Sequence, residues 1–348
     1  MKKLLLIGSD SIHTYNYYLL VSDFFDEVVL ITNSNSQNYT CKTVIVNFSL
    51  RNLITVQKTI ATIKETVNSF TPSIIHIHQA NSGAFISLFA TRKIKTPKIL
   101  TAWGSDVLST PSKGYWYKKM LLYILNHADY FSADSADLAS VMQRYVQKKK
   151  LNTLIANFGI DIKIDNDSSA KQNLIYSNRL HQKLYRIDKI ILAFEFFLKH
   201  QQEDWKLVIA GAGEETDNLK ELTTSLNLNP HVTFAGWLNK ETNLDYYKKA
   251  KLFISIPESD ATSISLLESM AAGCIPLVSD LPANKEWIED GRNGIIVKNE
   301  NENFIQKALA LNTTLCSSIN QKLIQEKATK VSQRKLFIDL YKRILGIQ

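Results

Sequence analysis

Two acidic residues, Asp260 and Glu268, lie eight positions apart, with a turn of small and hydroxyl side chains between them. Asp260 is expected at the end of a strand and Glu268 on the short helix that follows the turn; at about 3.6 residues per helical turn the spacing is about two turns, so both carboxylates can face one crevice. Thr262 and Ser263 would open that helix, where the first backbone N–H groups lack partners and attract phosphate. The pattern is typical of a site for a nucleotide joined to a sugar.

Each acid has a separate expected role at this site. A carboxylate accepts hydrogen bonds at two oxygens, so Glu268 suits two neighbouring ribose hydroxyls. Asp260 would then contact the sugar attached to the diphosphate. An acid pair on one helix face is also the usual pattern of a solvated surface, and these residues alone leave that interpretation open.

The segment SNRLHQKLYRIDK at 177–189 supplies positive charge directly after an apolar run. Arg179 follows the run at once, so a buried strand would hold it at a sheet edge. A departing nucleoside diphosphate gains negative charge, which a fixed guanidinium and an ammonium stabilise without a metal ion. Lys183 is the expected second cation and Arg186 the alternative, although basic loop residues are commonly only solvated.

Gly211 and Gly213 lie in KLVIAGAGEE at 206–215, where an apolar run meets a helical pattern. The pair matches part of the dinucleotide-binding glycine pattern but lacks its third glycine. A bound NAD would also require an acidic residue about 20 positions downstream, whereas this chain continues to HVTFAGWL at 231–238. We therefore expect Gly211 in a nucleotide site and no nicotinamide cofactor.

Length and composition limit the class of protein. The 348 residues exceed the size of about 250–300 at which one core usually suffices, so two domains are expected. The three cysteines show neither a disulfide framework nor zinc spacing. A net charge of +8 favours anionic partners, but no nucleic-acid-binding motif accompanies it. No apolar run approaches the ~20 residues of a membrane span. We expect a cytoplasmic protein, soluble or peripheral on the inner face of the membrane.

Short apolar runs alternate with helical patterns along the whole chain. Runs such as SIIHIH at 73–78 and IPLVS at 275–279 are apolar on both faces, as parallel strands covered by helices require. The alternation predicts an α/β protein with two doubly wound, Rossmann-like domains. The polar segment 161–172 is the expected linker. Its position divides the chain into domains at 1–163 and 164–330.

Together these segments resemble the family-4 retaining glycosyltransferases. The resemblance rests on D-A-T-S-I-S-L-L-E from Asp260 onward, on the arginine of a G-R-L motif, on a V-x-F-x-G strand, and on P-x-N-x-E and D-G-x-N-G within 281–297. It is strong over 174–297 and thinner over 1–160. Two residues of this stretch depart from the family pattern: Asp260 stands where many members have Glu, and Asn178 where they have Gly; Trp103 in the first half is a third departure.

The resemblance implies the GT-B fold, in which two Rossmann-like domains face each other across a cleft and a C-terminal helix, here 331–348, packs back onto the first domain. It implies transfer of a hexose from a nucleotide-diphosphate sugar, with UDP favoured, to a hydroxyl of a sugar or lipid-linked glycan. The anomeric configuration would be retained, in the synthesis of a cell-surface polysaccharide. Neither a metal nor another cofactor is expected.

The resemblance also assigns site residues. The expected catalytic residues are Arg179, Lys183, Asp260 and Glu268. The expected donor-binding residues are Gly211, Leu238, Thr262, Ser263 and Glu268, with backbone groups near Leu238 on the base.

The acceptor side depends on fewer residues. His78 ends the run SIIHIH, Trp103 stands where many relatives have a histidine, and Asp106 follows three positions later. We expect these three to contact the acceptor, with a helix-capping role for Asp106 as the alternative. Tryptophan cannot relay a proton, so no proton-transfer role is assigned at position 103.

The segment KGYWYKKMLLYIL at 113–125 combines three lysines with three aromatic residues ahead of an apolar helical pattern. Such a segment could rest on an anionic membrane surface, where a lipid-linked acceptor would lie. An amphipathic core helix with a basic edge is the alternative.

Two functions of other classes stay open. A nucleotide-sugar 2-epimerase shares the two-domain shape and would need no acceptor. A non-catalytic binding subunit would keep the fold and lose the chemistry, and the departures at Trp103 and Asp260 favour it. The donor hexose, the acceptor, the linkage and the oligomeric state are not specified by any motif.

Overall fold

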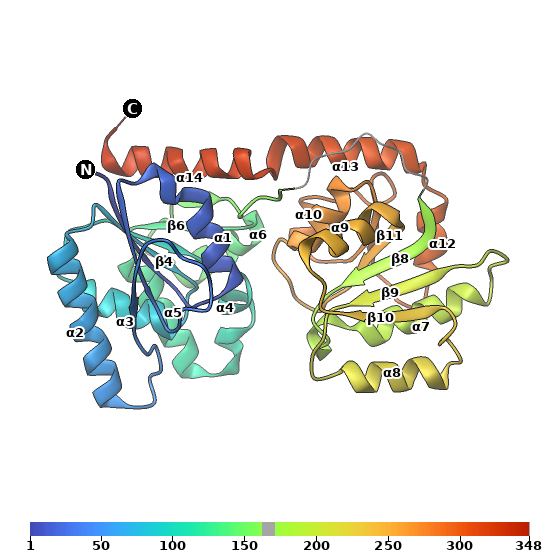
Figure 1. The fold of residues 1–348 in the computed structure, drawn as a ribbon, viewed down its shortest axis with the longest axis horizontal. Coiled ribbons are helices and arrows are strands. Elements are labelled where there is room, and N and C mark those ends of the chain that lie inside the picture. Colours follow the sequence, from blue (N-terminus) through green and yellow to red (C-terminus); the bar gives the residue numbers. More distant parts are fainter. Residues whose placement is uncertain (162–170, 348) are drawn as a thin grey trace. The chain divides into compact units, whose positions relative to one another are not determined.

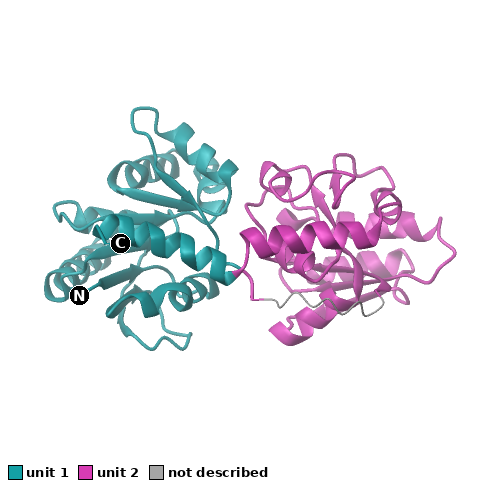
Figure 2. Cartoon of the chain, turned by 90° about the horizontal axis from the view of Figure 1, so that it is seen from above, with its two compact units in different colours: residues 1–159, 330–348 teal, residues 160–329 magenta. Residues whose placement is uncertain are grey.

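The computed structural model describes residues 1–161 and 171–347 of the chain. These residues form two compact units, one of Met1–Gly159 with Lys330–Gln348 and one of Ile160–Thr329 (Figure 2). Most of the expected linker at 161–172, and the expected boundary between 163 and 164, lie outside the described residues.

The first unit contains one parallel sheet with the strand order β3-β2-β1-β4-β5-β6-β7. Its strands are β1 (Lys3–Ile7), β2 (Glu27–Thr32), β3 (Lys42–Ile45), β4 (Ile74–His78), β5 (Lys98–Thr101), β6 (Tyr130–Ala133) and β7 (Thr153–Ile155). Its helices are α1 (Ile12–Val21), α2 (Leu53–Phe70), α3 (Ser82–Thr91), α4 (Ser105–Leu108), α5 (Tyr115–His127), α6 (Ala136–Tyr145) and α14 (Lys330–Leu345), with 3-10 turns η1 (Ser22–Phe24) and η2 (Thr110–Lys113).

The second unit repeats this architecture, with the strand order β10-β9-β8-β11-β12-β13. Its strands are β8 (Gln172–Asn178), β9 (Lys206–Ala210), β10 (Val232–Gly236), β11 (Ala250–Ser255), β12 (Ile275–Ser279) and β13 (Ile295–Val297). Its helices are α7 (Ile187–Leu198), α8 (Thr216–Ser225), α9 (Lys240–Lys249), α10 (Ile264–Ala271), α11 (Pro282–Lys285), α12 (Phe304–Leu309) and α13 (Thr313–Lys327), with the turn η3 (Lys183–Tyr185).

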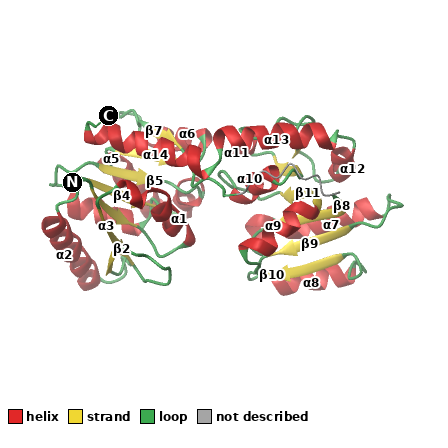
Figure 3. Cartoon of the chain, turned by 45° about the horizontal axis from the view of Figure 1, so that its top comes forward, coloured by secondary structure: helices red, strands yellow, loops and turns green. Residues whose placement is uncertain are grey.

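Helices cover both faces of each sheet, which explains why the strands are apolar throughout (Figure 3). All five residues of β4 and of β12 are buried. In the second unit, α7 and α8 lie on one face of the sheet, and α9 and α10 lie on the other (Figure 1). The predicted fold class, two doubly wound α/β domains, is confirmed.

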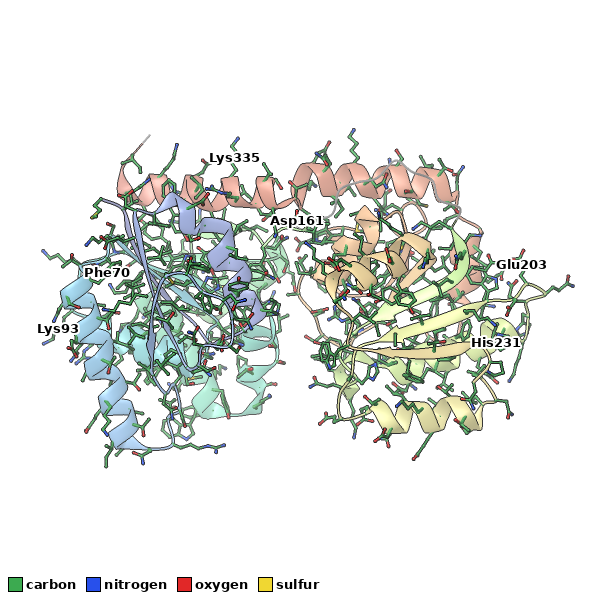
Figure 4. All side chains as sticks on the ribbon, viewed as in Figure 1. Phe70, Lys93, Asp161, Glu203, His231 and Lys335 are labelled. Atoms are coloured by element: carbon green, nitrogen blue, oxygen red, sulfur yellow. The ribbon has the colours of Figure 1, made fainter. Side chains whose placement is uncertain are left out.

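The C-terminal helix α14 is part of the first unit, against β1 and α1. Phe337 and Tyr341 are buried in the same core cluster as Tyr17. The Tyr341 hydroxyl also lies 2.9 Å from His76 Nδ1 in the middle of the sheet. Lys335, on the opposite side of the helix, points away from the unit (Figure 4). The helix therefore contributes one apolar face to the first core.

The strand order reverses direction twice, between β1 and β4 in the first sheet and between β8 and β11 in the second. In doubly wound sheets, ligands bind outside the carboxyl ends of the strands at such a switch point. A ligand site is therefore expected at the residues that follow β8 and β11, and at those that follow β4 and β5. No helix among residues 1–161 and 171–347 is both long and apolar enough to cross a lipid bilayer.

Candidate functional site

Arg179 lies at the switch point of the second sheet, one residue after β8. Its Nη2 is 2.5 Å from Asp260 Oδ2, and its Nη1 donates a hydrogen bond to Ser263 Oγ. The guanidinium also lies 4.5 Å from the centre of the Tyr185 ring. The structure thus brings together three residues that the sequence predicted for one site, from segments about eighty positions apart.

Asp260 precedes the helix that carries Glu268, and the turn expected at 261–263 separates the two. Ser263 is the N-cap of α10, and the helix begins only at Ile264. Asp260 therefore lies in the preceding loop, where its Oδ1 accepts a hydrogen bond from the Ala261 N–H. This loop directs the carboxylate toward Arg179. Burial raises the pKa of Asp260, and Arg179 opposes that rise.

The start of α10 is enclosed by side chains. Thr262 and Ser263 are buried, and Trp287 Nε1 lies 3.4 Å from Thr262 Oγ1. Ser263 makes no side-chain capping bond to its own helix, because its hydroxyl accepts from Arg179. The first N–H groups of α10 are therefore directed at the space beside the guanidinium, as an anion site requires.

Gly211 and Gly213 shape the loop that carries Arg179. A Cβ atom on Gly211 would lie closer than 3.0 Å to the Arg179 carbonyl oxygen, and one on Gly213 would crowd the His181 carbonyl. Gly211 also has φ +104°, which disfavours other residues. Its N–H donates to the Gly236 carbonyl at 2.7 Å. The structure therefore shows a packing role for Gly211, which the sequence placed in the nucleotide site.

Glu268 lies on α10 in front of a polar cluster that the sequence did not reveal. Asn243 Nδ2 on α9 is 3.5 Å from Glu268 Oε2. Asn243 Oδ1 in turn accepts from Tyr176 Oη at 2.5 Å and from Asn178 Nδ2 at 2.9 Å, and Tyr247 Oη donates to Asn178 Oδ1 at 3.0 Å. Burial raises the pKa of Glu268. No local sequence pattern signals this cluster, because it depends on how α9 packs against β8 and α10.

Lys183 and Arg186 line a common pocket of ≈ 470 Å³ between η3, α7 and α8, together with Glu215 and Glu258. Lys183 is exposed. Arg186 forms an ion pair with Glu300 and has φ +54° at the start of α7. Arg186 is thus held by a carboxylate, which leaves Lys183 as the better candidate for a ligand phosphate.

Leu238 lies two residues after β10 and is half-buried against the cluster formed by α9 and α10. Asn239 follows it and caps α9 through a 2.8 Å bond from the Thr242 N–H. The backbone at Leu238 therefore lies next to the helix that supports Glu268. Among the residues that the structure describes, no group of three or more His, Cys, Asp or Glu side chains is arranged to hold a metal ion.

The three expected acceptor residues lie together at the carboxyl ends of β4 and β5. Asp106 is buried, and its carboxylate accepts from the Ala80 N–H at 2.6 Å and the Trp103 N–H at 3.1 Å. Gly104, rather than Asp106, is the N-cap of α4. Asp106 therefore joins the two loops after β4 and β5. Burial raises its pKa.

His78 is held by Trp103, whose Nε1 donates to His78 Nδ1 at 3.2 Å. An indole nitrogen can only donate, so Nδ1 accepts and the neutral ring carries its proton on Nε2. Burial lowers the pKa of His78 to about 3. Nε2 is buried and has no hydrogen-bond partner among the described residues. His78 is therefore a neutral donor at this edge.

Both halves of the chain match known protein families. Residues 157–326 match the family described as Glycosyl transferases group 1, and residues 2–135 match Glycosyl transferase 4-like. The chain belongs to the group 1 glycosyltransferases. The predicted family is therefore confirmed, and the first match begins close to the boundary of the second structural unit at Ile160.

Two relatives illustrate how far this glycosyltransferase has diverged. It is 26% identical over 239 residues to an uncharacterized glycosyltransferase of Methanocaldococcus jannaschii. The aligned region covers 64% of this chain and 60% of that protein. It is 24% identical over 294 residues to the alpha-monoglucosyldiacylglycerol synthase of Streptococcus pneumoniae, 77% of this chain and 65% of that one. The matches thus span less than two thirds of either relative.

Solved structures of glycosyltransferases share the fold. Anabaena HepE in complex with UDP matches with a TM-score of 0.78 and 15% identity, over 99% of this chain and 100% of that one. Sucrose-phosphate synthase from Thermosynechococcus elongatus matches with a TM-score of 0.82 and 16% identity, again over 99% and 100%. These likenesses confirm the GT-B fold class.

Proposed function

We propose that this glycosyltransferase moves a hexose from a nucleoside-diphosphate sugar, with UDP the favoured nucleotide, to a hydroxyl of a sugar or lipid-linked glycan. The observation that carries the proposal is the guanidinium of Arg179, bonded to Asp260 and Ser263 at the switch point of the second sheet. Glu268, on the helix that Ser263 caps, is then available for the ribose. UDP is favoured because HepE, which shares the fold, was crystallised with UDP and with UDP-glucose.

The reaction requires charge stabilisation at the donor diphosphate. The bond between the sugar C1 and the diphosphate oxygen breaks, and C1 bonds to the acceptor oxygen on the same face, which retains the anomeric configuration. The acceptor proton passes to the departing phosphate oxygen. Arg179, Lys183 and the first N–H groups of α10 stabilise the diphosphate charge, and these cations supply what a metal ion would otherwise supply.

Asp260 orients the transferred sugar once the diphosphate has taken over the guanidinium. The backbone beside Leu238 contacts the base, and Gly211 fixes the loop of Arg179. On the acceptor side, the neutral Nε2–H of His78 holds an acceptor oxygen, directly or through a water, rather than removing a proton. Because its Nδ1 is occupied by Trp103, His78 cannot serve as a general base in this state.

The acceptor belongs to a glycan-assembly reaction on a lipid carrier or a lipid. One relative of this chain, 24% identical over 245 residues, is named for adding N-acetylgalactosamine to an undecaprenol-linked glycan in Campylobacter jejuni. Another is the alpha-monoglucosyldiacylglycerol synthase of Streptococcus pneumoniae. These names support our proposal that the enzyme acts at the cytoplasmic face of a membrane, in cell-surface polysaccharide synthesis.

Calorimetric titration with UDP, GDP and NAD in EDTA tests the donor site. We expect UDP to bind at micromolar concentration, Glu268→Ala to abolish binding, and Glu289→Ala, an exposed carboxylate of the same unit, to leave it unchanged. Binding of no nucleotide would overturn the transferase proposal and favour a binding subunit. Conversion of UDP-N-acetylglucosamine without an acceptor would favour the epimerase. With a UDP-hexose and a lipid extract as substrates, NMR of the product reports the anomeric configuration.

A further inference from the structure

Two helix starts in the first unit expose large apolar side chains at their tips. At the start of α5, Tyr115, Trp116 and Tyr117 are 66%, 80% and 46% exposed. At the start of α2, Leu53 and Ile54 are 78% and 64% exposed. Single exposed apolar residues are normal on a protein surface, but two groups on helix tips of one unit are not explained by chance exposure.

The two tips lie at the same edge of the sheet. α2 follows β3, and α5 follows β5 by way of α4 and η2. Because β3 and β5 belong to one parallel sheet, their carboxyl ends share an edge, and both helices begin there. α3 packs between α2 and α5. At about 8–10 Å between packed helix axes, the tips are about 20 Å apart, close enough to meet one flat surface together.

The charge around these tips has one sign. Residues 46–58 carry Arg51 and Lys58, residues 107–128 carry Lys113, Lys118 and Lys119, and neither stretch contains an Asp or Glu. These five cationic side chains are exposed. Lys119 lies 5.3 Å from the Tyr115 ring centre, so charge and aromatic surface share one helix face. Aromatic residues flanked by lysines are the composition that anchors proteins at a bilayer interface.

We propose that the starts of α2 and α5 form a docking surface for an anionic lipid bilayer. Trp116, Tyr115, Leu53 and Ile54 enter the headgroup region, and the surrounding lysines and arginines attract the acidic lipids. The surface lies at the same edge as His78, which ends β4, and Trp103, which lies two residues after β5. A bilayer on this edge brings lipid-linked compounds to those residues, a consequence that rests on the proposed function, whereas the docking itself does not.

Vesicle sedimentation tests the docking surface. The full chain is mixed with vesicles of phosphatidylcholine alone or with about one third phosphatidylglycerol, a membrane of strongly negative surface potential. We expect binding to the anionic vesicles only, and its loss as salt rises from about 0.1 to about 0.5 M, because salt screens the attraction. Equal binding to both vesicles, or none to the anionic ones, would overturn the proposal.

Paired variants locate the surface. The double change Lys118→Ser and Lys119→Ser should weaken binding about twenty- to thirtyfold, at about fivefold per lysine. Lys148→Ser with Lys150→Ser removes the same charge from exposed positions after α6 and should leave binding closer to the unaltered protein. Equal losses in the two double variants would show a general charge effect and refute this location.

A second pair of variants tests the apolar tips. Trp116→Ser should weaken binding about tenfold or more, since a buried large side chain contributes that much. Val331→Ser, an 81% exposed position on α14, should have no effect. If Trp116→Ser instead converted a dimer to a monomer in sedimentation velocity without changing vesicle binding, the surface would be a self-association site. UDP titration of each variant separates failure here from failure of the donor site.

Discussion

The ion pair between Arg179 and Asp260 allows us to predict in which direction a substitution of Asp260 changes the affinity for the donor. The cation expected to bind the diphosphate is bonded to Asp260 at 2.5 Å before any donor arrives. A donor diphosphate must therefore share or displace that carboxylate. Asp260→Asn keeps the shape of the side chain and removes its charge, so the guanidinium becomes more available. We expect UDP to bind more tightly, although transfer of the sugar becomes slower because the sugar loses its orienting acid.

The magnitude follows from the difference between two hydrogen bonds. A hydrogen bond to a charged group contributes about 1.5–3 kcal/mol net, and a neutral one about 0.5–1.5 kcal/mol. In Asp260→Asn, the hydrogen bond to Arg179 that the diphosphate must displace is weaker by roughly 1–2 kcal/mol. This difference corresponds to UDP binding about five- to thirtyfold tighter. Stability should change by less than about 1 kcal/mol. Burial raises the pKa of Asp260 in spite of Arg179, so folding does not favour the ionised carboxylate.

Calorimetry with UDP in EDTA measures the affinity, and urea unfolding measures the stability. Glu289→Gln is the matched control, because it removes one negative charge from the same unit at an exposed pair with Arg292. That variant should bind UDP within about twofold of the unaltered protein. If Asp260→Asn folds normally but binds UDP no more tightly, the diphosphate does not compete with Asp260 for Arg179. If the variant transfers the sugar at an unchanged rate, Asp260 does not orient the sugar.

Three further predictions concern the same unit. Gly211→Ala should lower the free energy of unfolding by about 3 kcal/mol and weaken UDP binding, because the added Cβ would meet a backbone carbonyl. Gly236 has φ +66° and open space around it, so Gly236→Ala should lower the free energy of unfolding by only about 1–2 kcal/mol. Urea unfolding of both variants measures the difference. Burial raises the pKa of Glu268 above its ordinary value of 4.5, and only the ionised carboxylate accepts hydrogen bonds from two hydroxyls. The affinity for a UDP-hexose should therefore begin to fall, as the pH is lowered, at a pH above 4.5. Glu268→Gln should bind weakly and show no such pH dependence. Lys183→Ala should weaken UDP binding about tenfold and Arg186→Ala less than about threefold, and the reverse order in calorimetry would make Arg186 the second cation.

The fold was predictable because parallel strands buried on both faces leave a simple pattern. SIIHIH and IPLVS became β4 and β12, fully buried, and the alternation of such runs with helical patterns is enough to specify doubly wound sheets. The exact strand order and the start of α10 were not accessible in this way. Helix starts depend on one or two backbone angles, so the sequence located the start of α10 only to within the turn 261–263, and the structure has Ser263 as the N-cap.

The position of a candidate-site residue was predictable where it directly follows a strand, because the strand fixes the position of that residue. Arg179 after β8 is such a case, and its guanidinium contacts Ser263, while its role toward a phosphate stays a prediction. The support of Glu268 by Asn243 was not predictable, since it depends on how α9 packs against β8. Neither residue follows a strand, and no local pattern reports the distance between two helices.

The departures from the family pattern gain a physical meaning from these contacts. Asn178, which replaces a glycine, bridges Tyr247 and Asn243 behind Glu268. Trp103, which replaces a histidine, donates to His78 and sets its tautomer. In both places the unusual residue is hydrogen-bonded to neighbours that must themselves be of the right type, so each replacement belongs to a cluster rather than standing alone. Such clusters stabilise the groups that would face ligands, which is more readily explained by altered ligand preference than by the loss of a site.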